Sequence, residues 1–194
     1  MAVRYFQQMG MKSQEELIKR YTTLGEDAMW HAFYLSFRET KMEGETGVWS
    51  HISHNLADSF GSAVYVDGVL RRETVRYVNR SPQSTMRDKH SNERGREAID
   101  NYFHKIHPFA GTGDICVIVV AAMYYTKFLE EGSYGYNGAA GLRPKIRVVS
   151  AARDYIDRNW WYYMRDIYVR WQLPKPKARI VRGDMSGIYN YYNA

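Results

Sequence analysis

The order of the secondary-structure signals along this chain of 194 residues predicts an α+β fold. Long segments with helical periodicity lie near both ends, and a hairpin signal and a β-branched run lie between them. Hydrophobic residues make up 45% of the chain, which is enough for a sizeable core. We therefore expect one domain at residues 13–172, an N-terminal arm at 1–12 and a C-terminal arm at 173–194.

The first helix is predicted to start at a capping box, Ser13-Gln-Glu-Glu16, and to continue to about Met42. Apolar or small residues recur every three or four positions through most of this segment, as in an amphipathic helix. Gly25 lies near the middle, where we expect a glycine to weaken the helix and to bend or split it.

A helical turn followed by a β-hairpin is predicted next. Residues 48–60 have the spacing of a short amphipathic helix or helical turn, and apolar residues then alternate over residues 64–77. Asp67-Gly68 between the two strands is a type I′ turn signal. At the join of helix and strand, we expect Asn55 and Ser59 to bind backbone groups.

Residues 79–111 are interpreted as an insertion between strands, with a polar stretch followed by a short amphipathic helix. An insertion on a rigid sheet is a natural place for partner contacts. The run Ile115–Met123 predicts a buried strand, and Cys116 within it is interpreted as a small buried hydrophobic residue. The glycine-rich stretch at 132–141 lacks a phosphate-loop pattern and is interpreted as a flexible or close-packed loop.

The last helix is predicted to start at Pro144 and to run for about 28 residues, roughly 42 Å, so that its far end projects from a small domain. Residues 143–182 hold eleven Lys and Arg and three Asp, a net charge of +8, against +6 for the whole chain. This charge predicts either a solvated helix face or a surface for nucleic acid or an acidic partner. The candidates for contact with channel DNA or an acidic partner are Arg147, Arg158, Arg165, Arg170, Lys175 and Lys177.

The content of 17 tyrosines and five tryptophans favours a protein that contacts other proteins, although a tyrosine-rich core is an alternative. The C-terminal tyrosines are candidates for clasping a neighbouring subunit. The subunit-interface candidates are Tyr134, Tyr136, Trp160, Trp161, Tyr162, Tyr163, Trp171, Tyr189, Tyr191 and Tyr192.

The histidines provide a weak signal for a metal site. His51, His54 and Asp58 would share one face of a helix, and His104 with His107 forms a second pair. Neither pair has the HExxH pattern of zinc proteases, so surface or partly buried histidines are favoured. We expect no catalytic residues, no metal and no cofactor, and a metal-dependent enzyme is the least favoured alternative.

Three segments resemble, in order, motifs of the neck and tail-completion proteins of tailed bacteriophages. The stretch HNLADSFGSAVYVDG, from His54, is similar to the family's turn into its first strand. The stretch MYYTKFLEEG, from Met123, resembles the family's strand-end element, with Thr126 where the family has alanine. The stretch LRPKIRVVSAA, from Leu142, resembles the start of its C-terminal helix, with Lys145 where phenylalanine is usual.

The resemblance implies an antiparallel sheet with a long N-terminal and a long C-terminal helix packed on it, plus an inserted loop-helix and terminal arms. It implies a structural virion protein, not an enzyme, that forms a ring in the head–tail connector, joins portal to tail and extends the DNA channel.

The partners that the resemblance implies are further copies of the chain, a portal or head–tail adaptor protein, tail proteins and the packaged DNA. A dodecamer is expected from matching to the portal, and a hexamer is the alternative. The protein would be made in the host cytoplasm and reside in the virion, with no membrane contact. The alternative function is nucleic-acid binding by the basic C-terminal helix.

Overall fold

The computed structural model describes residues 10–42, 55–75, 94–108, 110–111, 115–123, 126, 130, 147 and 149–172, with side chains for all of these except 37–42, 55 and 57. Its helices are α2 (Met11–Met42), α3 (Asn55–Asp58), α4 (Gly95–Lys105) and α6 (Val149–Arg170), and its strands are β1 (Phe60–Val66), β2 (Val69–Val75) and β3 (Ile115–Ala121). These elements confirm the predicted α+β class, with an antiparallel sheet and long helices near both ends.

The described strands form one antiparallel sheet in the order β2-β1-β3. The hairpin between β1 and β2 turns at Asp67 and Gly68, whose φ angles of 53° and 76° are those that a type I′ turn requires. This confirms the predicted turn. Strand β3, predicted to be buried, lies at an edge among the described strands, and its residues Ile115–Val119 are half-buried, Cys116 included.

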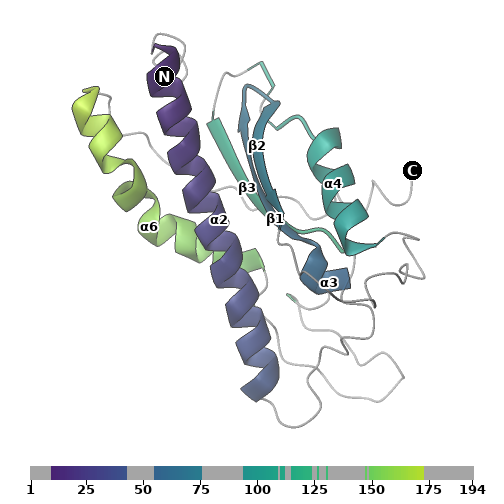
Figure 1. Ribbon diagram of the computed structural model, residues 1–194. Coiled ribbons are helices and arrows are strands. Elements are labelled where there is room, and N and C mark those ends of the chain that lie inside the picture. Colours follow the sequence, from purple (N-terminus) through teal and green to yellow (C-terminus); the bar gives the residue numbers. More distant parts are fainter. Residues whose placement is uncertain are drawn as a thin grey trace.

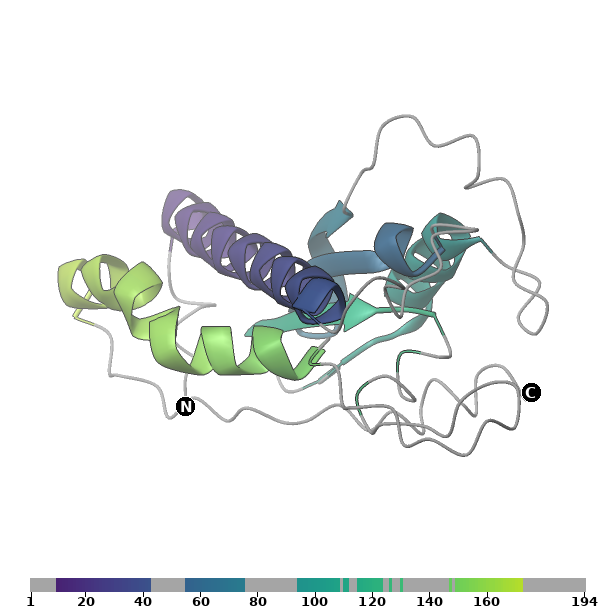
Figure 2. The ribbon, with the colours of Figure 1, turned by 90° about the horizontal axis from the view of Figure 1, so that it is seen from below.

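The sheet lies between two helical layers, with α2 and α6 on one face and α4 on the other (Figures 1 and 2). Every residue of β1 is buried, as expected for a central strand covered on both faces. Ser62 faces α2 at Gly25, whereas the neighbouring Gly61 faces Ile99 and Phe103 of α4. Successive residues of β1 therefore contribute to opposite faces.

Gly25 does not split α2, contrary to one form of the prediction, because the helix is continuous from Met11 to Met42. Helix α2 also shows no kink in Figure 1. A Cβ atom at Gly25 would lie 3.0 Å from Val117 Cγ1 and 3.2 Å from Ser62 Cβ. The glycine therefore allows the helix backbone to approach the sheet closely, and the packing of α2 on the sheet outweighs the weak helix propensity.

The predicted capping box does not form. Helix α2 begins at Met11, and the carbonyl of Gly10 accepts hydrogen bonds from the backbone N–H groups of Ser13 at 2.9 Å and Gln14 at 3.1 Å. Ser13 is buried inside the first turn. The Glu16 carboxylate accepts hydrogen bonds from Arg170 of α6 at 3.1 Å. The Glu16 side chain, which the local pattern assigned to a helix cap, therefore forms a contact between α2 and α6 instead.

Helix α6 changes its buried side along its length and bends midway (Figures 1 and 2). Its first turns bury Ala151 and Ala152 against the C-terminal half of α2 and the end of β3. Its last turns bury Met164, Ile167 and Tyr168 against the N-terminal half of α2. The far end therefore packs on α2 and does not project, which corrects the prediction made from helix length alone.

Helix α4 lies within the segment predicted as an insertion, and it forms part of the core. This segment forms the predicted short amphipathic helix, with Ala98, Ile99 and Phe103 buried against the sheet. The buried Tyr65 hydroxyl of β1 donates a hydrogen bond to the Phe103 carbonyl at 2.7 Å. Because this polar contact is enclosed, it fixes the C-terminal part of α4 on the sheet.

Candidate functional site

The three segments that carry the family resemblance meet at one end of the sheet. Phe60 at the start of β1 pairs with Ala121 at the end of β3, and the backbone N–H of Ala122 donates to the Ser59 carbonyl at 3.0 Å. Leu56, Met123 and Ala151, one from each segment, belong to the same buried cluster. We call this region the motif junction. Residues far apart in sequence thus form one structural joint.

Side chains of the motif junction bind backbone groups. The Ser59 hydroxyl donates to the Leu56 carbonyl at 2.9 Å, which confirms the prediction for Ser59, while the Asn55 side chain lies outside the described part. The Thr126 hydroxyl donates to the Ala121 carbonyl at 3.0 Å. These bonds satisfy carbonyls at the ends of α3 and β3.

Glu130 has a role at the motif junction that the sequence pattern did not reveal. Its Oε1 atom accepts hydrogen bonds from the backbone N–H groups of Val149 and Ser150, the latter at 2.7 Å. These are the first residues of α6, where N–H groups lack partners within the helix and a negative charge is stabilised. The strand-end segment therefore caps the C-terminal helix.

The outward side of α6 carries a stripe of arginine and apolar side chains. Arg158, Tyr162, Arg165 and Val169 follow one another at helical spacing and are all exposed. Tyr162 is 82% exposed and Val169 is 66% exposed, which is unusual for side chains of this size. We call these four residues the α6 stripe. Guanidinium groups with a tyrosine between them suit a carboxylate- or phosphate-bearing partner.

The other aromatic candidates on α6 are more enclosed than Tyr162. Trp160 and Trp161 are half-buried, with ring centroids 5.5 Å apart, and pack on the cluster around Leu17. The Tyr163 hydroxyl donates to Asp27 of α2 and lies 3.0 Å from the Tyr155 hydroxyl. Trp171, just after the helix, is 46% exposed. Tyr162 and Trp171 are thus the described candidates most available to a partner.

The basic candidates divide into paired and unpaired groups. Arg147 forms an ion pair with Asp154, and Arg170 forms one with Glu16. Arg158 and Arg165 have no ion-pair partner among the described residues. The candidates Tyr134, Tyr136, Lys175, Lys177, Tyr189, Tyr191 and Tyr192 lie outside the described residues.

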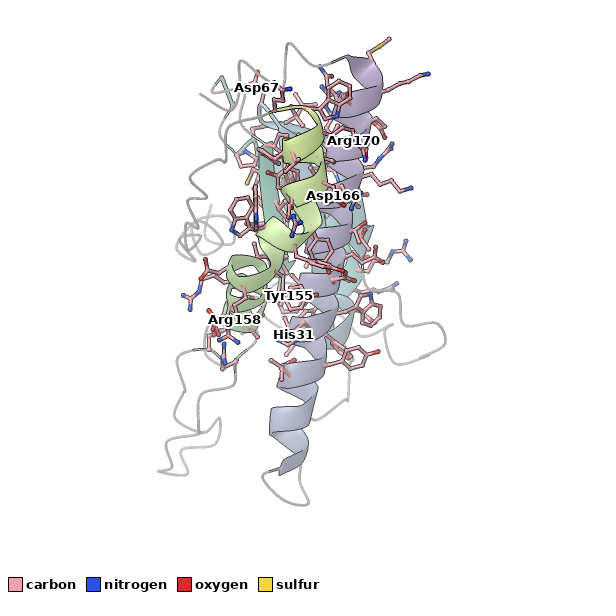
Figure 3. The ribbon with its side chains drawn as sticks, turned by 90° about the vertical axis from the view of Figure 1, so that its left-hand side faces the viewer. His31, Asp67, Tyr155, Arg158, Asp166 and Arg170 are labelled. Atoms are coloured by element: carbon pink, nitrogen blue, oxygen red, sulfur yellow. The ribbon has the colours of Figure 1, made fainter. Side chains whose placement is uncertain are left out.

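A hollow of about 380 Å³ lies where α6 crosses α2. Its lining residues are His31, Leu35, Arg147, Ala151, Asp154, Tyr155, Arg158 and Asn159. The hollow brings together two of the predicted basic candidates, Arg147 and Arg158, with His31, whose presence there no sequence pattern indicated. Figure 3 shows His31 beside Tyr155, with Arg158 close by and Arg170 near the other end of α6.

The charges around the hollow shift the pKa values of its titratable groups. Burial, and then the charges of Arg147 and Arg158, lower the pKa of His31 from its ordinary value of 6.5. The pKa of the Asp154 carboxyl is lowered first by the hydrogen bond from Arg153 and then by the charges of the surrounding arginines. His31 is therefore neutral and Asp154 charged at pH 7.

The histidine candidates do not come together in the described residues. The His104 ring lies 2.9 Å from the Asp100 carbonyl and the His107 ring 3.2 Å from the Gly68 carbonyl, so each has its own backbone partner. His51 and His54 lie outside the described part. Over the described ranges, no group of three His, Cys, Asp or Glu side chains is placed to hold a metal ion.

In the same ranges, no helix has the length and apolar character needed to span a bilayer. Comparisons of the chain with protein families, with curated proteins and with solved structures found no match.

Proposed function

We propose that this chain is a structural virion protein of a tailed phage that forms a ring in the head–tail connector. The observation that carries the proposal is the motif junction. Three segments that each resemble a phage neck motif contribute Leu56, Met123 and Ala151 to one buried cluster, and Glu130 of the second segment accepts a hydrogen bond from Ser150 of the third. A chance resemblance in three separate stretches gives no reason for the stretches to meet in space.

The α6 stripe supplies a surface suited to assembly. A closed ring requires a heterologous interface, in which two different patches of one subunit contact its two neighbours. Tyr162 combines a large apolar ring with a hydroxyl at low conformational cost, as contact residues in interfaces do. In this proposal the stripe is one of the two patches, and its arginines face acidic groups of a neighbour, the portal or an adaptor protein.

The proposed function is structural, not catalytic, and its place is the virion neck. The ring would extend the channel through which the packaged DNA passes and would offer a platform for tail proteins. The expected symmetry is twelvefold where the ring matches a portal, with sixfold as the alternative.

Nucleic-acid binding is the second candidate function, and one observation favours it. The α6 stripe places Tyr162 between Arg158 and Arg165, and an aromatic ring flanked by basic groups can stack on a base while the arginines contact phosphates. In this case the isolated chain would bind single-stranded DNA, and the affinity would fall steeply with salt.

The test of the proposed function is the assembly state of the full chain. We expect discrete rings by negative-stain electron microscopy and a matching mass by light scattering. Tyr162→Glu should abolish the rings because it places a charge on the proposed contact. Tyr34→Glu is the matched control, since Tyr34 is 61% exposed on α2 and outside the stripe.

The two functions give different results in this test. A chain that remains monomeric at all concentrations and binds single-stranded DNA with a steep salt dependence would refute the ring and support the alternative. If rings form equally well with Tyr162→Glu, the ring proposal stands, but the α6 stripe is not part of the subunit interface.

A further inference from the structure

The hollow at the crossing of α2 and α6 has a mixed lining. Leu35 of α2 and Ala151 of α6 supply apolar surface, and the Tyr155 ring lies with its centroid 4.9 Å from that of His31. Arg158, labelled near His31 in Figure 3, supplies a polar group at the same place. Asn159 supplies a second one. A few polar groups on an otherwise apolar wall are typical of sites that bind one group in a defined orientation.

The lining has an excess of positive charge. Two arginines, Arg147 and Arg158, minus one aspartate, Asp154, give +1 with His31 neutral. The Asp154 carboxylate already accepts hydrogen bonds from Arg147 and from Arg153, the latter at 2.9 Å. Arg158 has no ion-pair partner among the described residues. The hollow therefore has one guanidinium with capacity to bind an anion.

The charge pattern of the hollow favours a side chain over a nucleic acid. A volume of about 380 Å³ has room for a single protruding side chain, and the walls at Leu35 and Ala151 match its methylene groups. A DNA backbone carries a repeating series of charges and needs a continuous basic track. The Asp154 carboxylate in the lining would repel such a series, whereas a single carboxylate can bind at the Arg158 side.

We propose that this hollow binds the carboxylate of an acidic side chain from a neighbouring polypeptide, with Arg158 and Asn159 donating hydrogen bonds to it. The Asn159 side-chain NH₂ group has two N–H donors. One donates a hydrogen bond to the Tyr155 carbonyl at 2.8 Å, and the other can donate to a ligand. The Arg158 guanidinium can form two parallel bonds to a carboxylate. This site goes beyond the ring proposal, because any acidic segment of suitable shape can occupy it.

Proton binding by His31 provides a direct readout of occupancy. The groups around His31 are Arg147, Arg158, Asp154 and Tyr155, together with Asp27 one turn earlier on α2. A bound carboxylate adds a negative charge to this set, so it raises the pKa of His31. By linkage, binding tightens as the pH falls from 7 through the titration range of His31.

The experiment titrates the His31 imidazole by NMR in the full chain, with and without a short blocked oligoglutamate peptide. The His31→Gln variant identifies the His31 signal among those of the six histidines. We expect the peptide to raise the pKa of His31 in a saturable manner. Arg158→Gln should weaken peptide binding by about tenfold, because it removes the charged hydrogen-bond donor.

Arg165→Gln is the matched control, since it removes the same charge from an exposed position further along α6. It should change the affinity by less than about twofold, the effect of a screened charge. Equal weakening by Arg158→Gln and Arg165→Gln would overturn the proposal, because the peptide would then sense only net charge. A peptide that leaves the pKa of His31 unchanged, or a His31 signal that responds to duplex DNA and not to the peptide, would also overturn it.

Discussion

Replacing Gly61 by alanine tests whether α4 is a fixed part of the core. Gly61 lies in the central strand β1 and faces α4. A Cβ atom at this position would lie 2.9 Å from Ile99 Cγ1, 2.9 Å from Phe103 Cε2 and 3.0 Å from Ile99 Cδ1. Ile99 and Phe103 are both completely buried, so neither side chain can rotate into solvent to make room.

The size of the effect follows from these distances. Unstrained carbon atoms lie about 3.5–4.0 Å apart, so α4 would have to withdraw by roughly half an ångström. Overpacking of this kind costs about 1–3 kcal/mol. Replacing a strand glycine returns about 0.5–1 kcal/mol, because alanine loses less conformational entropy on folding. We expect Gly61→Ala to lower the free energy of unfolding by about 1–2 kcal/mol.

Urea unfolding measures this change as a lower midpoint with an unchanged slope. A double-mutant cycle with Ile99→Ala identifies the cause, because that substitution removes two of the three close contacts. The combined loss should be smaller than the sum of the single losses by at least about 0.5 kcal/mol. If Gly61→Ala is as stable as the parent chain, or if the two losses add, α4 does not pack on Gly61 as described.

Three further predictions concern the contacts of α6 and the hollow. Glu130→Gln should lower the free energy of unfolding by about 0.3–1 kcal/mol, because it removes the negative charge at the start of α6; thermal unfolding followed by circular dichroism measures it. Tyr163→Phe should cost about 1 kcal/mol in urea unfolding, because it removes the hydrogen bond from Tyr163 to Asp27; an unchanged midpoint would exclude that bond from stabilising the helix pair. Because the pKa of His31 is lowered in the folded chain, the unfolded chain binds a proton at this residue first as the pH falls. The contribution of His31 to the free energy of unfolding is therefore complete above pH 6.5 and declines below that pH. His31→Gln should flatten this part of the stability–pH profile.

The elements with strong local signals were predictable from the sequence. The Asp67-Gly68 pair predicts the type I′ turn directly, because Asp and Gly are residue types that tolerate the positive φ angles found at both positions. The helical periodicity of the α4 segment likewise predicted a short amphipathic helix, and the structure has one, with Ala98, Ile99 and Phe103 on its buried side. In these cases the residues that form the signal also form the structure.

The predictions that failed involve contacts between distant segments. The local sequence predicts that Gly25 weakens α2, but in the structure the glycine allows α2 to pack closely on Ser62 and Val117 of the sheet. The local pattern predicts that Glu16 caps the first helix, but in the structure the Glu16 carboxylate binds Arg170 of α6. No local pattern contains these partners, which lie up to 154 residues away. Tertiary packing therefore decides what such residues do.

The same distinction applies to the candidate surfaces. The α6 stripe could be predicted from the sequence, because Arg158, Tyr162 and Arg165 follow one another at helical spacing within one helix. The hollow could not be predicted, because His31 and Leu35 lie on α2 whereas its other lining residues lie on or just before α6. The sequence did identify Arg147 and Arg158 as members of a basic segment, but not that they would meet a neutral histidine.

The change of buried side along α6 connects the hollow and the stripe. Ala151 and Ala152 are buried early in the helix, and Met164 and Ile167 are buried later on a different side. Arg158 lies between these two parts, so it lines the hollow and also begins the stripe. Arg158→Gln should therefore impair both peptide binding and ring assembly, whereas Tyr162→Ala, which adds no charge beside Arg158, should impair assembly alone. Peptide binding that survives Tyr162→Ala would separate the two surfaces, and its loss would mean that the hollow and the stripe act as one site.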